Sequence, residues 1–133
     1  DRYVCIMHQG HPLARKRLTL KQYVNAKHLL VSLTGEATGL IDEQLREQGL
    51  KRRVMLTVNQ FTLVPELVAT SDSIAAIPQR ILSKSAYASQ LHIAELPVEM
   101  AIAELQMMWH ERKQRDPAHE WLRSLMIELC DRM

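Results

Sequence analysis

The chain has 133 residues, of which 47% are hydrophobic and 5% aromatic, and 17 Lys and Arg against 15 Asp and Glu give a formal net charge of +2. This size suits one domain, or one domain with a piece of another, and the hydrophobic fraction argues against disorder. A charge so close to zero gives no general attraction to nucleic acid. The basic groups at residues 15–17 and 51–53 are short, and we interpret both as solvated loops rather than phosphate contacts.

The cysteines and the hydropathy pattern bear on the compartment. Cys5 and Cys130 are far apart and form neither a disulfide framework nor a metal-binding pattern, which favours a reducing compartment. The sequence has no signal peptide and no apolar run of membrane-spanning length. We therefore expect a cytoplasmic protein with no membrane partner, no metal and no cofactor. The opening at Asp1, directly ahead of an apolar run at 3–7, also leads us to expect a start inside a fold.

The first half of the chain predicts alternating strands and helices. Residues 2–8 are rich in strand-forming residues, and residues 18–24 show apolar positions at helical spacing behind Thr19 as an N-cap. Residues 28–33 are an apolar run that predicts a buried strand. The next predicted elements are a helix at 40–50 that stops at Gly49 and a strand at 54–58.

The most informative stretch is residues 59–80. A helical apolar pattern comes first, and the four small polar residues at 70–73 end it in a turn. Residues 74–77 are a short apolar run typical of a strand buried on both faces. Pro78 then opens another helix that continues over residues 80–87. Helix, buried strand and helix in this order predict a parallel α/β unit.

The last part of the chain predicts two more strands and a terminal helix. The strands are at 92–96 and 101–109, and for the second the pattern leaves a helix open as the alternative. Asp116 followed by Pro117 is typical of an N-cap and a first helical turn. The apolar residues expected on one face of the terminal helix are Trp121, Leu122, Leu125, Met126 and Leu129.

Six short motifs occur in a distinctive order and spacing over essentially the whole chain. They are RYVCIM at 2–7, HPLA at 11–14, GLKRRV at 49–54, SDSIAAIPQR at 71–80, WH at 109–110 and RDPAHEWLR at 115–123. Together they resemble the effector-binding domain of LysR-type transcriptional regulators, in the branch of nodulation and aromatic-degradation regulators.

The resemblance implies an α/β fold of the periplasmic-binding-protein-like type II kind, with two lobes joined by crossover strands. Residues 12–100 would form one nearly complete lobe, lobe II. Residues 1–11 and 101–133 would supply the crossover strands and the C-terminal helix of lobe I. An N-terminal winged helix-turn-helix, which the resemblance places outside this chain, would make the only contact with DNA.

A candidate effector site follows from the strand ends. Small ligands bind α/β folds at the carboxyl ends of strands, where loops present polar groups to a crevice. Hydroxyl and amide groups beside an apolar wall suit a small, partly aromatic effector. Capping of the next helix stays an alternative for Thr34 and Thr38, and a place in the core stays one for Phe61. The candidates are Ser32, Thr34, Thr38, Asn59, Gln60 and Phe61 from this rule, and Asp1 and Leu105 from the resemblance.

The predicted function is effector sensing and oligomerisation within a LysR-type regulator, with no enzymatic activity. His8 and His11 offer two metal ligands, but no further ligand follows at a recognisable spacing and no nucleophile motif is present. A solute-binding protein of the periplasmic type is the alternative, because it shares the two-lobe architecture. The sequence shows no helix-turn-helix with a basic recognition helix.

Assembly is predicted from apolar surface. The crossover strands and the apolar face of the terminal helix would lack their lobe I partners in this chain. Apolar patches of that size attract further copies, so a homo-oligomer, a dimer or a tetramer, is expected.

Overall fold

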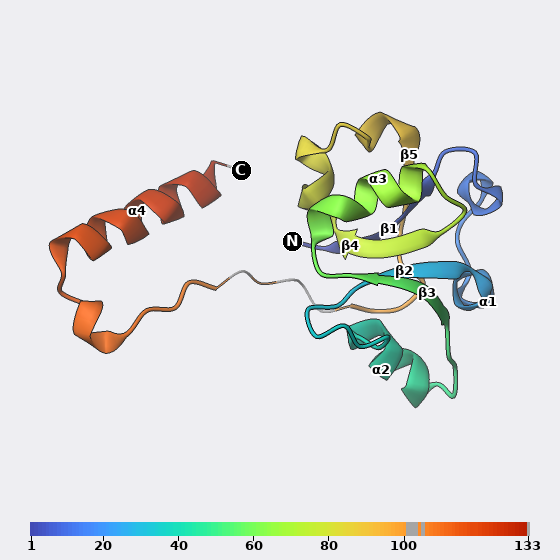
Figure 1. Cartoon of the computed structure of the whole chain (residues 1–133), viewed down its shortest axis with the longest axis horizontal. Helices are drawn as coiled ribbons and strands as arrows, with labels where there is room; N and C mark the ends of the chain where they lie inside the picture. Colours follow the sequence, from blue (N-terminus) through green and yellow to red (C-terminus); the bar gives the residue numbers. More distant parts are fainter. Residues whose placement is uncertain (101–103, 105, 133) are drawn as a thin grey trace. The chain divides into compact units, whose positions relative to one another are not determined.

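Five strands form one mixed sheet with the order β3-β2-β4-β1-β5 in the computed structural model, which describes residues 1–100, 104 and 106–132 (Figure 1). β2 pairs in parallel with β3 and β4, whereas β1 pairs antiparallel with β4 and β5. The strands are β1 (Tyr3–His8), β2 (Lys27–Val31), β3 (Arg53–Val58), β4 (Ile74–Pro78) and β5 (Leu91–Ala94).

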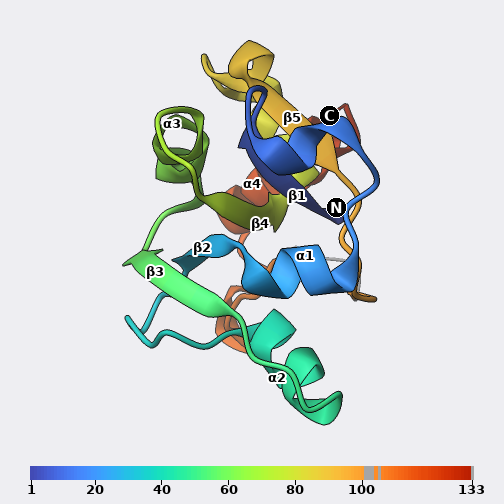
Figure 2. The ribbon, with the colours of Figure 1, turned by 90° about the vertical axis from the view of Figure 1, so that its right-hand side faces the viewer.

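Helices cover both faces of this sheet. Figure 2 shows α3 on the side opposite to α1 and α2. The α-helices are α1 (Leu20–Asn25), α2 (Leu40–Glu47), α3 (Val64–Ala69) and α4 (Pro117–Asp131), and the 3-10 helices are η1 (Pro12–Arg15), η2 (Phe61–Leu63), η3 (Gln79–Lys84), η4 (Ala88–Gln90) and η5 (Glu111–Lys113).

The alternation of side chains along β1 builds two cores, one on each face. Val4 and Ile6 are buried with Val64 and Val68 of α3, while Cys5 and Met7 are buried in a cluster with residues of α1 and α2. Successive residues of a strand point to opposite faces, so a strand buried on both sides reads as a continuous apolar run. The apolar run in RYVCIM is therefore explained by the position of β1 inside the sheet, between β4 and β5, with a core on each face.

The predicted parallel unit at residues 59–80 is confirmed in its main part. β3 and β4 both pair in parallel with β2, and α3 connects them. The helix after Pro78 is shorter than predicted: it is the 3-10 helix η3, which ends at Lys84 with Ser85 as its C-cap. The Ser85 hydroxyl accepts a hydrogen bond from the Tyr87 amide, a local contact that competes with continued helix.

The caps predicted from local chemistry are confirmed. Thr19 forms a capping box with Gln22, Gly49 has φ +69° just after α2, and the Asp116 carboxylate accepts hydrogen bonds from Ala118 and His119 amides. The Thr19 and Asp116 side chains each satisfy backbone N–H groups two or three residues further along the chain.

The predicted strand at 101–109 is wrong where it can be judged. Residues 101–103 and 105 lie outside the described residues, and residues 104 and 106–110 have no regular secondary structure. None of the described strands pairs with this segment. A strand needs a neighbour to satisfy its backbone, and the helix alternative is not observed there either.

The chain divides into two units, Asp1–Ala103 and Glu104–Met133. The first contains the sheet, and the second contains α4. The prediction that residues 12–100 form lobe II stays untested, and residues 1–11 contribute β1, which lies between β4 and β5. Within the second unit the apolar residues of α4 are largely exposed: Trp121, Leu122, Met126, Ile127 and Leu129.

Candidate functional site

A cavity of about 290 Å³ opens where β2 ends, and we call it the strand-end cavity. Its walls come from the end of β2, the loop before α2, the start of η2, the middle of β4 and the start of β1. The lining residues are Tyr3, Leu29, Leu30, Val31, Ser32, Leu33, Thr34, Thr38, Gly39, Leu40, Ile41, Arg52, Phe61, Ala76 and Met100.

Four of the predicted effector residues line this cavity: Ser32, Thr34, Thr38 and Phe61. The Ser32 amide donates to the Val58 carbonyl at 2.8 Å, which fixes the loop after β2 against the end of β3. The Ser32 and Thr34 hydroxyl oxygens are 3.4 Å apart. Phe61 is half-buried and also packs against the core on the α3 face. The structure thus brings these four together, and their role in binding stays a prediction.

The capping alternative for Thr34 and Thr38 is not observed. α2 begins behind Gly39, whose amide donates to the Asp42 carboxylate at 2.7 Å, and neither threonine caps it. Within the described residues the Thr38 hydroxyl has no hydrogen-bond partner. It is therefore available to a ligand.

The other four predicted residues lie elsewhere. Asn59 and Gln60 are exposed after β3 and do not line the cavity. The Asp1 carboxylate accepts a hydrogen bond from the Arg80 amide at 2.9 Å and lines a separate hollow near η3. Leu105 lies outside the described residues. Their roles also stay predictions.

Several lining residues are not predictable from the sequence pattern. Tyr3 and Ala76 reach the cavity because β1 pairs antiparallel with β4, a long-range pairing that no local pattern predicts. The Tyr3 phenol is protonated at neutral pH and can donate a hydrogen bond, and burial raises its pKa further. In the sequence, the one sign that Tyr3 could line a site was its place at the start of an apolar run.

Among the described residues Arg52 is the only charged one that lines the cavity, and its guanidinium is paired with the Asp42 carboxylate. Its guanidinium donates to both oxygens of Asp42, at 2.8 and 2.7 Å, and to the Tyr23 hydroxyl at 3.1 Å. Burial alone would raise the pKa of Asp42, but the hydrogen bonds and charge of Arg52 lower it. The prediction of a solvated loop at 51–53 is wrong for Arg52, which is 5% exposed.

Tyr23 and His28 are buried next to Arg52. The His28 Nε2 atom is 2.6 Å from the Tyr23 carbonyl oxygen, so this nitrogen carries the proton and donates. Burial lowers the pKa of His28 to about 4, and the imidazole is neutral at pH 7. The floor of the cavity therefore carries no net charge.

The arrangement suits noncovalent binding. Among the described residues no group of three or more His, Cys, Asp or Glu could hold a metal ion. The Nδ1 atoms of His8 and His11 each accept a backbone hydrogen bond, from Gly10 and Leu13. The described part of the chain also contains no helix long and apolar enough to cross a membrane.

Comparison with known proteins gives consistent results. The profile of the LysR substrate binding domain matches residues 1–131. The transcriptional activator NagR of a Ralstonia species is 32% identical over 128 residues, which cover 96% of this chain and 42% of that protein. Nodulation protein D 3 of Mesorhizobium japonicum is 31% identical over 134 residues, covering 100% and 44%. The chain thus spans less than half the length of these relatives.

Solved structures show the same fold. The regulatory domain of MexT, a transcriptional activator in Pseudomonas aeruginosa, is 35% identical with a TM-score of 0.78, covering 93% of this chain and 59% of that one. The effector-binding domain of QuiR in complex with shikimate has a TM-score of 0.59 at 18% identity, covering 76% and 47%. These matches assign the mixed α/β sheet to the periplasmic-binding-protein-like type II fold.

Proposed function

Because the chain belongs to the LysR substrate-binding domain family, as its motifs predicted, we propose that it senses a small-molecule effector for a DNA-binding transcriptional regulator. The strand-end cavity is the proposed site of binding in this chain. The proposal depends most on one observation: Ser32, Thr34 and Thr38 line the same cavity at the end of a parallel strand.

The lining suggests the chemistry of the effector. Tyr3 and Phe61 supply aromatic surface, and Leu30 and Met100 supply aliphatic surface. Since Arg52 is neutralised by Asp42, no charge on this floor favours an anionic group. We therefore propose that the part of the effector held here is apolar or aromatic, with hydroxyl groups that bond to the threonine side chains.

Named relatives support a small-molecule effector without identifying it. QuiR was solved with shikimate and CcmR with 2-PG, and the relatives named above are transcriptional regulators. Those names favour a regulator over a periplasmic solute-binding protein and over an enzyme. We propose no catalytic activity for the chain.

The larger assembly is also part of the proposal. The relatives extend well beyond the matched region, and DNA contact through a winged helix-turn-helix would belong to that additional part. The largely exposed apolar residues of α4, with Trp121 67% exposed, support burial against further protein in a homo-oligomer. We also propose that the regulator is cytoplasmic, as expected for a DNA-binding transcriptional regulator. Sedimentation of the full-length regulator tests this, and a monomer at high concentration would refute the oligomer.

A thermal-shift screen of the full-length regulator against aromatic acids and flavonoid-like compounds tests the effector proposal. A ligand that binds only the folded protein raises its apparent stability. We expect Thr38→Val to remove most of that shift and to leave the unliganded transition unchanged. The matched control is Thr62→Val, because Thr62 is exposed and does not line the cavity. A hit that is equally affected by both variants would place binding elsewhere.

A further inference from the structure

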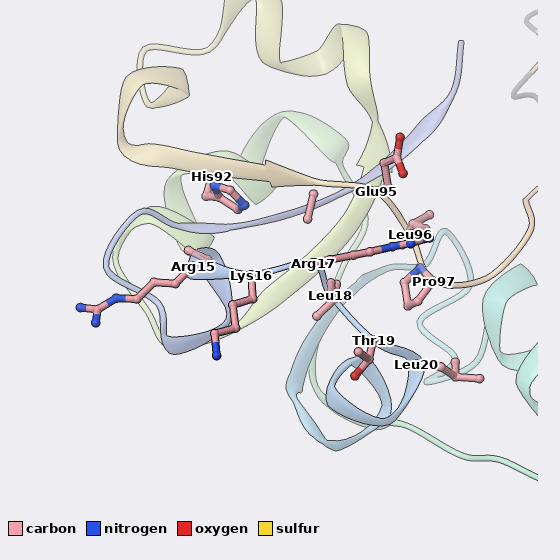
Figure 3. A pocket seen from close by; sticks show the side chains of 12 residues that line it. Arg15, Lys16, Arg17, Leu18, Thr19, Leu20, His92, Glu95, Leu96 and Pro97 are labelled. Atoms are coloured by element: carbon pink, nitrogen blue, oxygen red, sulfur yellow. The ribbon is translucent and has the colours of Figure 1, made fainter.

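A second hollow, of about 690 Å³, lies between the segment 14–20 and the segment 92–97 (Figure 3). It shares no lining residue with the strand-end cavity. We call it the basic groove, because three consecutive cations, Arg15, Lys16 and Arg17, lie along one side of it. Its volume is within the range of small-molecule sites.

The cations of the basic groove are exposed and unpaired. Within the described residues none of the three side chains forms a hydrogen bond or an ion pair. Glu95 is the one acidic residue among the described residues that line the groove. Figure 3 shows the Arg17 side chain running along the groove toward Leu96, while the Glu95 carboxylate points away from it. The groove therefore has a local excess of positive charge.

Some basic residues elsewhere in the described part of the chain are paired with a carboxylate. Lys27 pairs with Asp72 at 2.5 Å, and Lys113 pairs with Asp116 at 2.7 Å. The whole chain has a formal charge of only +2, so three unpaired cations in succession are a local feature. Figure 3 shows the Arg15, Lys16 and Arg17 side chains pointing in different directions, so an anion needs more than one charged group to contact two of them.

The groove is anchored at its base. Leu18 is only 4% exposed, because its side chain belongs to the core beneath α1 and α2. The capping box of Thr19 fixes the start of α1, and the β1–β5 pairing sets His92 opposite Met7. The backbone that carries Arg17 is thus held on one side by the core and faces a paired strand on the other.

We propose that the basic groove binds a small multivalent anion, with at least two phosphate or carboxylate groups, at a site separate from the effector cavity. Lys16 and Arg17 provide the charge, and Leu96 and Pro97 form an apolar wall that strengthens the local potential. A nucleic acid is a poorer match, because one short basic segment on a nearly neutral chain offers few phosphate contacts.

Calorimetric titration of the full-length protein with inorganic pyrophosphate and with tricarballylate, at constant ionic strength, tests this. The double variant Lys16→Gln/Arg17→Gln should weaken binding of both anions about tenfold or more. Lys51→Gln/Lys84→Gln removes the same charge from exposed positions outside the groove and should leave binding unchanged. Glu95→Gln should tighten it.

Three results would overturn the proposal. They are no saturable binding of either anion, an equal loss in both double variants, and tighter binding to random-sequence duplex DNA that depends on the same lysine and arginine. Thermal unfolding of each variant checks that it is folded. If the double variant does not fold, the single changes Lys16→Gln and Arg17→Gln provide the same comparison, with about half the effect on a logarithmic scale.

Discussion

The guanidinium carbon of Arg123 lies 4.6 Å from the centroid of the Trp109 ring. The same guanidinium donates to the carbonyl oxygens of Lys113 and Gln114, at 3.2 and 2.9 Å. The Gln114 side chain in turn accepts a hydrogen bond from the Trp109 indole at 2.6 Å. Arg123 is 9% exposed, the lowest value of any α4 residue. Its contacts join the segment 109–114 to this helix.

Replacement of Arg123 by methionine should release that segment. Loss of the cation–π contact and of two hydrogen bonds should lower protection of the amides at 109–116 by about 1–2 kcal/mol in hydrogen exchange. Arg123→Lys should behave similarly, because an ammonium cannot stack and donate in one plane. Arg115→Met is the control, since Arg115 is exposed. Equal protection in the Arg123 and Arg115 variants would show that the stacked arginine does not hold the segment.

The Arg52–Asp42 pair should be a main determinant of stability in the first unit. Arg52→Met leaves the half-buried Asp42 carboxylate without its cation and should lower the free energy of unfolding by about 3–5 kcal/mol in urea titration. Asp42→Asn should also destabilise, and the double variant should cost less than the sum of the two. Lys51→Met changes an exposed neighbour and should stay within about 0.5 kcal/mol. Strict additivity would argue against direct coupling of the pair.

Arg52 also illustrates what the sequence alone could predict. Capping by Thr19 and Asp116 depends on contacts two or three residues apart, so local chemistry was sufficient. The burial of Arg52 depends on Asp42 and Tyr23, which are 10 and 29 residues away, and a basic triplet gave no sign of it. Tyr3 reached the cavity for the same kind of reason, through an antiparallel pairing.

Part of the candidate site was predictable because it follows a general rule. Ser32 and Thr38 come after a parallel strand, and loops at that edge of a sheet line the crevice. The position of Asp1 beside the Arg80 amide depends on a contact across 79 residues, and only the fold could reveal it. A general rule about strand ends was therefore sufficient to predict the loops. Which other residues line the cavity depends on contacts between distant parts of the chain.

His28 should make stability depend on pH. Its pKa falls from the ordinary 6.5 to about 4 in the folded protein because burial disfavours the imidazolium. Above pH 6.5 both states are neutral, and the stability is fully present. Between pH 6.5 and 4 the unfolded state binds a proton that the folded state does not, so stability should fall by about 3 kcal/mol.

Urea titrations at several pH values measure that slope. His28→Gln keeps a donor for the Tyr23 carbonyl but removes the titration, so the slope between pH 6.5 and 4 should flatten. Some slope should remain, because burial also lowers the pKa of His11. Lys84→Gln removes an exposed charge and should keep the full slope. An unchanged profile in His28→Gln would show that another group carries the effect.

Substitution of Gly49 should lower the free energy of unfolding through its left-handed backbone conformation, with no steric clash. Its φ is +69°, and a Cβ added there would meet nothing within 4 Å. Gly49→Ala should therefore lower the free energy of unfolding by about 1–2 kcal/mol through backbone strain alone. Gly49→Asn should cost less, because asparagine tolerates this conformation at helix ends. Urea titration compares the two. Equal losses for Ala and Asn would mean that side-chain contacts, rather than the backbone angle, require glycine at the end of α2.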